Sequence, residues 1–162
     1  MPPKERIILG IDPGLALVGY GLIKQQGQQN SCLAYGCITT EIKDDSLRLE
    51  QIYQELQVLI TKYQPTLAVV EKLYFSKNTK TALAVAQARG VILLTLKKNN
   101  LALIEITPLE VKQALTGYGQ ANKGQIQRMV KLLLKLAAIP KPDDAADALA
   151  LALYGSNFKQ LI

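Results

Sequence analysis

Two carboxylates stand where runs of apolar residues end. Asp12 closes the run at residues 6–12 and Glu71 closes the run at residues 67–71, and both runs are typical of buried strands. Ligands of open α/β sheets bind outside the carboxyl ends of the strands, so both side chains are candidates for a site. The Pro-Gly pair after Asp12 predicts a sharp turn that leaves this carboxylate near the sheet surface. A single aspartate in such a place is nevertheless more often a helix cap or a turn former.

A second pair of acids lies in the segment at residues 142–150. Asp144 and Asp147 are three positions apart, so on a helix they share one face close to its first turn. Acids at a helix start commonly do no more than complement the helix dipole, worth ~0.3–1 kcal/mol each, and this explains Asp143 and in part Asp144. It explains Asp147 poorly, because the alanines around it indicate a tightly packed helix.

These four carboxylates together favour a hard divalent cation. The chain contains no histidine and no C-x-x-C pair, which excludes a histidine base and a zinc site built from imidazoles. Four converging carboxylates would repel one another and raise their pKa values unless cations neutralised them. We therefore expect Mg²⁺ or Mn²⁺, as two ions about 3.5–4 Å apart, in the hydrolysis of a phosphodiester. One ion would activate the attacking water and the other would stabilise the leaving 3′ oxygen, without a side-chain nucleophile.

Basic residues gather in the middle of the chain. Residues 72–141 hold twelve Lys and Arg against two acids, whereas the rest of the chain holds seven against eleven. This local charge of +10, in a chain of net charge +6, indicates a polyanionic partner, since each neutralised phosphate releases condensed counterions. A solvated surface rich in lysine would give the same balance, so charge alone leaves both interpretations open.

The order of the predicted elements is that of an α/β fold. Strands are predicted at residues 6–12, 18–24, 31–41, 67–71 and 101–106, with a hairpin connection at 25–30. Helices are predicted at residues 44–63, 77–98, 108–115, 125–137 and 142–154, with a loop at 117–124. Thr107 is a candidate N-cap, and Gly90 interrupts the pattern of the second helix. Strands that are apolar on both faces imply helices on both faces of one sheet, and we predict a single domain over residues 1–162.

Cysteine usage and hydropathy predict a cytoplasmic protein with no membrane partner. Cys32 and Cys37 are five apart in a predicted strand, so a regular pleat would point them to opposite faces, as two reduced structural thiols. No apolar stretch approaches the roughly 18 residues of a membrane span. The first residues lead directly into a strand and lack the apolar core of a secretion signal.

Four motifs occur in order between residue 7 and about residue 154. They are Gly10-Ile11-Asp12-Pro13-Gly14, Glu71-Lys72-Leu73-Tyr74-Phe75, Ala86-Gln87-Ala88-Arg89-Gly90 and Asp144-Ala145-Ala146-Asp147-Ala148-Leu149-Ala150. The first is weak by itself, because many nucleotide-binding folds have Asp-x-Gly after the first strand, and the last is strong. Together they resemble the RuvC family of bacterial Holliday-junction resolvases.

The resemblance implies an RNase H-like α/β fold, with a central mixed five-stranded sheet flanked by helices on both faces. It implies a Mg²⁺-dependent endonuclease that makes paired symmetric nicks across a four-way DNA junction in recombination and DNA repair. Two Mg²⁺ per active site are expected, with Mn²⁺ able to substitute. The implied partners are a second copy of the chain and the complex of the junction-binding RuvA with the motor RuvB.

The resemblance also assigns roles by motif position. Asp12, Glu71, Asp144 and Asp147 take the positions of the metal ligands. Lys112 and Lys123 match lysines that act on DNA near the cleavage site. Tyr74 stands where the family usually has a phenylalanine that contacts junction bases; its ring can still stack, worth ~1–3 kcal/mol per base, whereas Phe75 is more simply a core residue. The expected DNA-binding residues are therefore Tyr74, Lys77, Lys80, Arg89, Lys112 and Lys123.

A dimer has a physical rationale, because a four-way junction is approximately two-fold symmetric and a symmetric dimer presents two equivalent sites. The apolar face of the helix between Lys77 and Lys98 is the predicted interface.

Three other interpretations have to be weighed. A DNA-binding module without catalysis would keep the basic middle and use the acids as caps and turn formers. An ATP-handling fragment of the actin or sugar-kinase type needs a second Asp-x-Gly hairpin, which the sequence lacks. A different RNase H-like nuclease, such as an RNA-processing enzyme of the YqgF type, is disfavoured by the Ala-Gln-Ala-Arg-Gly motif and by the two late lysines.

Overall fold

The computed structural model describes residues 4–73 and 79–158. Tyr74, Phe75 and Lys77, which the sequence singles out, lie outside the described residues. Within the two described segments, no helix combines the length and the hydropathy needed to cross a lipid bilayer.

Five strands form one mixed sheet, as predicted. The strands are β1 (Glu5–Asp12), β2 (Leu17–Gln26), β3 (Gln29–Thr39), β4 (Leu67–Glu71) and β5 (Ala102–Ile106), in the order β3-β2-β1-β4-β5. β1, β2 and β3 pair antiparallel through two hairpins, whereas β1, β4 and β5 pair parallel. The ends of β1 and β4 therefore meet at one edge of the sheet, which brings Asp12 and Glu71 together.

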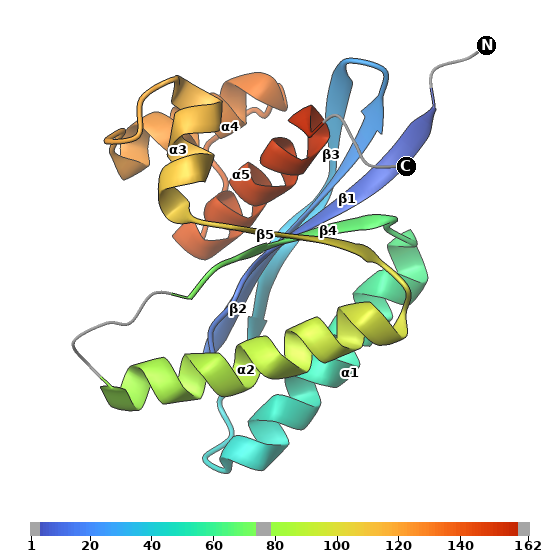
Figure 1. Ribbon diagram of the computed structural model, residues 1–162, viewed down its shortest axis with the longest axis vertical. Coiled ribbons are helices and arrows are strands. Elements are labelled where there is room, and N and C mark those ends of the chain that lie inside the picture. The colour runs from blue at the N-terminus through green and yellow to red at the C-terminus, as the bar shows by residue number, and fades with distance from the viewer. Residues whose placement is uncertain (1–3, 74–78, 159–162) are drawn as a thin grey trace.

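Helices cover both faces of the sheet (Figure 1). They are α1 (Asp45–Tyr63), α2 (Thr79–Lys98), α3 (Pro108–Thr116), α4 (Lys123–Leu133) and α5 (Asp143–Asn157). One apolar core joins the sheet to α1 and α2, and a second joins it to α3, α4 and α5. The strands feed both cores because successive side chains alternate: Ile8 packs toward α5, and Leu9 packs toward α1 and α2. The predicted fold class is confirmed.

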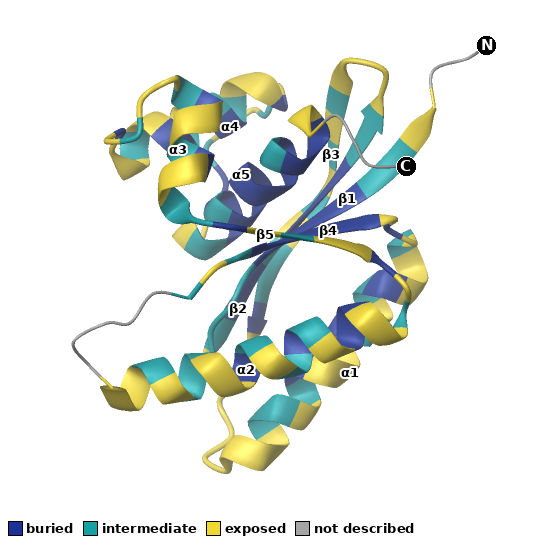
Figure 2. Cartoon of the chain, viewed as in Figure 1, coloured by how far each residue is buried: buried dark blue, intermediate teal, exposed yellow. Residues whose placement is uncertain are grey.

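Helix α5 lies directly on the middle of the sheet and is the most deeply buried helix in Figure 2. Glycines in the strands permit this close approach. A Cβ atom on Gly10 would lie 1.9 Å from the backbone oxygen of Ala148, and one on Gly19 would lie 2.2 Å from the backbone oxygen of Asp144. On the helix, alanines contribute to the same contact: Ala145, Ala146 and Ala148 of α5 are fully buried.

Capping corrects the predicted start of α4. Asn122 accepts a hydrogen bond from the Gln125 backbone N–H, and the Gln125 side chain accepts one from the Asn122 N–H. This reciprocal pair begins the helix at Lys123, inside the predicted loop. The helix ends at Leu133 rather than at residue 137, and Lys135 has a left-handed backbone with φ of 52°. The Thr107 cap is confirmed, and Gly90 does not interrupt α2.

The expected placement of the two cysteines on opposite faces is wrong. The β2–β3 register pairs Leu22 with Ala34 but Ile23 with Cys32, so β3 carries a bulge at Leu33. The extra residue reverses the alternation of the strand. Cys32 therefore packs into the α5-side core, and Cys37 pairs with Gly19, which lies against Asp144 of α5, so Cys37 is on the same side. Both thiols are free, as expected.

Candidate active site

Strand alternation directs Asp12 and Glu71 to the α5 side of the sheet. In β1, Ile8 packs in the α5-side core, and Asp12 is two alternations further along the strand. In β4, Val69 packs in the same core, and Glu71 follows it by one alternation. The two carboxylates thus leave neighbouring parallel strands on the face that α5 covers.

Helix α5 completes the cluster with its first two turns. The i, i+3 spacing places Asp144 and Asp147 on one face of the helix, as predicted. Ligand oxygens of Asp12, Asp144 and Asp147 all lie within 4.8 Å of one another. Glu71 is not one of these three residues, but its side chain is close enough to that of Asp12 for each carboxyl group to shift the pKa of the other. We refer to Asp12, Glu71, Asp144 and Asp147 as the carboxylate cluster.

Burial and mutual repulsion perturb the acids of the cluster. Burial, followed by the charges of Glu71 and Asp147, raises the pKa of Asp12 from 3.8 to about 9. Burial is also the largest cause that raises the pKa of Glu71 and that of Asp147. The nearby Lys112 and Lys123 oppose these two shifts without cancelling them. The cluster thus carries more negative charge than its protein surroundings neutralise, and its donors are all carboxylate oxygens, so the residues fit a hard divalent cation.

Lys123 borders the cluster from the first position of α4. Its Nζ lies 3.7 Å from Asp147 Oδ2 and 3.2 Å from Asp143 Oδ2. Asp143 also accepts a hydrogen bond of 3.0 Å from the Gln127 side chain. The ammonium group is half-exposed, so it can reach a phosphate while Asp143 and Asp147 hold it near the cluster.

Lys112 reaches the same place from α3. Lys112 and Lys123 line a pocket of about 220 Å³ together with Glu71 and Asp147. The pocket thus brings two carboxylate residues and two lysines together. Its remaining lining comes from the residues that pack α3, α4 and α5 together: Pro108, Val111, Ile126, Ala150 and Leu151.

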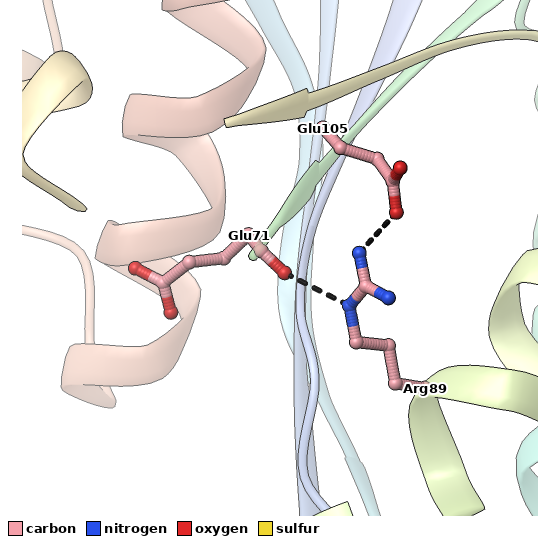
Figure 3. Close-up of polar contacts among 3 residues, drawn as sticks. All are labelled: Glu71, Arg89 and Glu105. Atoms are coloured by element: carbon pink, nitrogen blue, oxygen red, sulfur yellow. Dashed lines mark hydrogen bonds and ion pairs between the residues drawn. The ribbon is translucent and has the colours of Figure 1, made fainter. Parts of the chain in front are cut away.

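Two other predicted DNA-binding residues, Lys80 and Arg89, are not part of this pocket. Arg89 lies on the opposite side of the end of β4, where it contacts the backbone of Glu71 and the carboxylate of Glu105 (Figure 3). Lys80 is exposed in the first turn of α2 and lines a groove with Arg48 of α1. Tyr74 and Lys77 lie outside the described residues.

Sequence reasoning missed two acids. Asp143 is explained by the helix dipole alone in the sequence, but the structure pairs it with Lys123. Glu105 is not singled out at all, although it is an acid between apolar neighbours in a predicted strand, and that alternation was the available signal. It faces α2, where Arg89 pairs with it.

Comparison with known proteins adds sequence likeness to this geometry. Residues 8–154 match the family model described as crossover junction endodeoxyribonuclease RuvC. The chain is 53% identical over 155 residues to the protein of that name from Halothermothrix orenii, covering 94% of each chain. It is 53% identical over 156 residues to the one from Petrotoga mobilis, covering 95% of each.

Solved structures agree with the sequence relatives. Thermus thermophilus RuvC in complex with a Holliday junction substrate superposes with a TM-score of 0.86 at 29% identity, covering 91% of each chain. A yeast mitochondrial Holliday junction resolvase superposes with a TM-score of 0.65 at 18% identity, covering 90% of this chain and 76% of its own, a likeness of fold.

Proposed function

The chain belongs to the RuvC family of crossover junction endodeoxyribonucleases, and we propose that the carboxylate cluster is its active site. The chain is a nuclease that resolves Holliday junctions, as its relatives' names and its match to the family over residues 8–154 indicate. The observation that carries the assignment of the site is the convergence of Asp12, Asp144 and Asp147 oxygens within 4.8 Å of one another.

The metal of this site is Mg²⁺, held as two ions by Asp12, Glu71, Asp144 and Asp147. Bound ions of this kind polarise a scissile phosphate and lower the pKa of an attacking water. Mg²⁺ takes oxygen ligands, and the raised pKa values of the buried acids mean that a bound cation relieves an existing repulsion. Mn²⁺ prefers the same donors and substitutes in this role.

Lys112 and Lys123 hold the DNA strand at the cluster. They line the same pocket as Glu71 and Asp147, so a phosphate there meets lysines from α3 and α4. Asp143 limits the movement of the Lys123 ammonium without burying it. Two fixed cations beside the scissile phosphate stabilise charge that develops on its oxygens during cleavage.

A four-way DNA junction, rather than a single duplex, is the substrate. The basic middle of the chain supplies the affinity that does not depend on sequence, with Lys80 and Tyr74 as further DNA contacts. RuvA and RuvB are the protein partners. Because the bacterial chromosome lies in the cytoplasm, we assign the protein to the cytoplasm.

The active form is a symmetric homodimer that pairs through α2. Leu83 and Leu94 are exposed by 68% and 61%, and a spacing of eleven positions returns to the same side of a helix. Gly90, between them, has open space where a Cβ would stand. An exposed stripe of leucines around a glycine suits close helix packing, and a two-fold dimer matches a junction with two equivalent strands.

The test is cleavage of a synthetic mobile four-way junction, with mapping of both nicks. With Mg²⁺ the wild-type chain should cut two strands of like polarity at symmetric positions, and in EDTA it should bind without cutting. Asp12→Asn should lower the single-turnover rate by at least about 10³-fold, because it removes a charged metal ligand, and should leave junction affinity in EDTA unchanged. Glu50→Gln, in α1 and exposed, is the matched control. Cleavage by Asp12→Asn near the wild-type rate would refute the site, and binding without cleavage by the wild type in Mg²⁺ would leave a DNA-binding module.

A further inference from the structure

Arg89 crosses from α2 to the end of β4 and is held there by two strands. Its Nε donates a hydrogen bond of 3.3 Å to the backbone carbonyl oxygen of Glu71. Its Nη2 forms an ion pair with Glu105 of β5 (Figure 3). Only 18% of the Arg89 side chain is exposed. The guanidinium is therefore occupied by protein partners, in contrast to the exposed lysines of α2.

The contact between Arg89 and Glu71 lies at the end of β4, where this strand stops pairing with β1. The β1–β4 pairs end at Ile11 with Val70, one residue before Glu71. On the β5 side of β4, the Lys72 backbone N–H donates a hydrogen bond of 2.8 Å to the Ile106 carbonyl oxygen. This part of the chain is therefore still bonded to β5. The partly buried Glu71 carbonyl, one residue past the last β1–β4 pair, needs a donor, and Arg89 supplies it.

We propose that Arg89 is a positioning residue for the active site. By holding the backbone carbonyl of Glu71, it sets the direction in which the Glu71 carboxylate leaves the strand. In Figure 3 the carboxylate points toward α5 and the carbonyl points toward Arg89. Both groups are attached to one Cα, so a shift of the unanchored strand end that moves this Cα would also move the carboxylate away from Asp12. The inference rests on the proposed function, in which Glu71 is a metal ligand.

Glu105 acts in this arrangement through Arg89. An arginine presents several N–H donors in one plane, so the carbonyl and the carboxylate can be bound by the same rigid group. The ion pair with Glu105 thus keeps the guanidinium within hydrogen-bonding distance of the Glu71 carbonyl oxygen. A lysine has a single ammonium on a flexible stem, and it would keep the charge but lose this geometry.

The first measurement is a thermal-shift titration with Mg²⁺ in the absence of DNA. Arg89→Gln should raise the Mg²⁺ concentration at the midpoint of stabilisation by about 10-fold, the usual effect of removing a group that orients a metal ligand. Arg89→Lys should raise it by a smaller factor, and so should Glu105→Gln. The double variant should be no worse than Arg89→Gln alone, because both changes break one unit. Lys98→Gln, an exposed change in the last turn of α2, is the matched control.

The second measurement separates positioning from DNA contact. Junction affinity in EDTA should be the same for Arg89→Gln and wild type, and excess Mg²⁺ should restore most of the lost cleavage rate. A fall in affinity with an unchanged Mg²⁺ midpoint would overturn the inference and make Arg89 a DNA contact. If Arg89→Gln does not fold, Arg89→Lys and Glu105→Gln decide the question by the same two readouts. A wild-type chain that Mg²⁺ neither stabilises nor activates would overturn the proposed metal site itself.

Discussion

Gly10 of β1 lies directly against Ala148 of α5: a Cβ atom on the glycine would stand 1.9 Å from the alanine's backbone oxygen. This contact sets how close α5 comes to the sheet, and therefore how close Asp144 and Asp147 come to Asp12. The obstacle is backbone rather than a movable side chain, so the helix as a whole has to shift to admit a methyl group.

Gly10→Ala should therefore lower both stability and activity. We expect a loss of roughly 1–3 kcal/mol in the free energy of unfolding, the usual cost of overpacking, measured by urea denaturation. The Mg²⁺ concentration for half-maximal cleavage should rise, because α5 carries two of the ligands away from β1. Gly90→Ala is the control: its added methyl group meets open space in a helix, so stability at low protein concentration should rise by up to about 1 kcal/mol. If Gly10→Ala and Gly90→Ala had equal effects, the close β1–α5 contact would not be what determines stability and activity.

The stability of the protein in EDTA should fall as pH rises. The folded state holds the Asp12 proton up to a pKa of about 9, whereas an unfolded aspartate releases it near 3.8. Between these values the folded state binds more protons, so stability that is present at low pH is lost as the pH increases. The chain has no histidine, whose titration would otherwise contribute in the same range.

Melting curves at pH 5.5 and pH 8 test this linkage. Asp12→Asn in EDTA should melt higher than wild type at pH 8, by at least about 3 °C, because Asp12 has to take up a proton when the chain folds at that pH and an asparagine does not. Mg²⁺ at pH 8 should raise the melting temperature of the wild type more than that of Asp12→Asn. A wild-type melting temperature that does not change with pH would contradict the raised pKa.

Lys112→Ala and Lys123→Ala should slow cleavage more than they weaken binding. Both lysines line the pocket that Glu71 and Asp147 also line, so they act on the charge that develops during the reaction. We expect single-turnover rates to fall by roughly 10²-fold and junction affinity by less than about 3-fold. Lys62→Ala, in α1 on the other face of the sheet, is the matched control. A uniform loss of affinity at an unchanged rate would make these lysines phosphate anchors only.

Leu94→Asp should separate the proposed dimer into monomers. The substitution puts a charge in the exposed apolar stripe of α2, and burial of that charge against a partner helix would be unfavourable. Sedimentation should show the monomer mass, and a single junction should receive one nick rather than two. Val58→Asp, at a site in α1 that is exposed by 64%, controls for the added charge. A dimer that survives Leu94→Asp and also Leu83→Asp would move the interface off this helix.

Local patterns determined much of the protein. The apolar runs before Asp12 and Glu71 predicted the strands, the i, i+3 spacing predicted that Asp144 and Asp147 share a helical face, and four motifs predicted the family. These predictions of fold and family are confirmed, because they depend on periodicity and order along the chain. The helix start at Lys123 was missed by two residues, although its cap, Asn122, was visible.

Only the tertiary structure decided which face each side chain occupies. The spacing of the residues does not reveal the bulge at Leu33. This bulge reverses the alternation of side chains along β3 and brings Cys32 and Cys37 to one side of the sheet. In the sequence, Arg89 is one more cation of a basic segment. In the structure, the packing of α2 against the sheet brings it into contact with Glu71 and Glu105. Charge and periodicity are properties of the chain, whereas a partner across the sheet depends on how separate elements pack against one another.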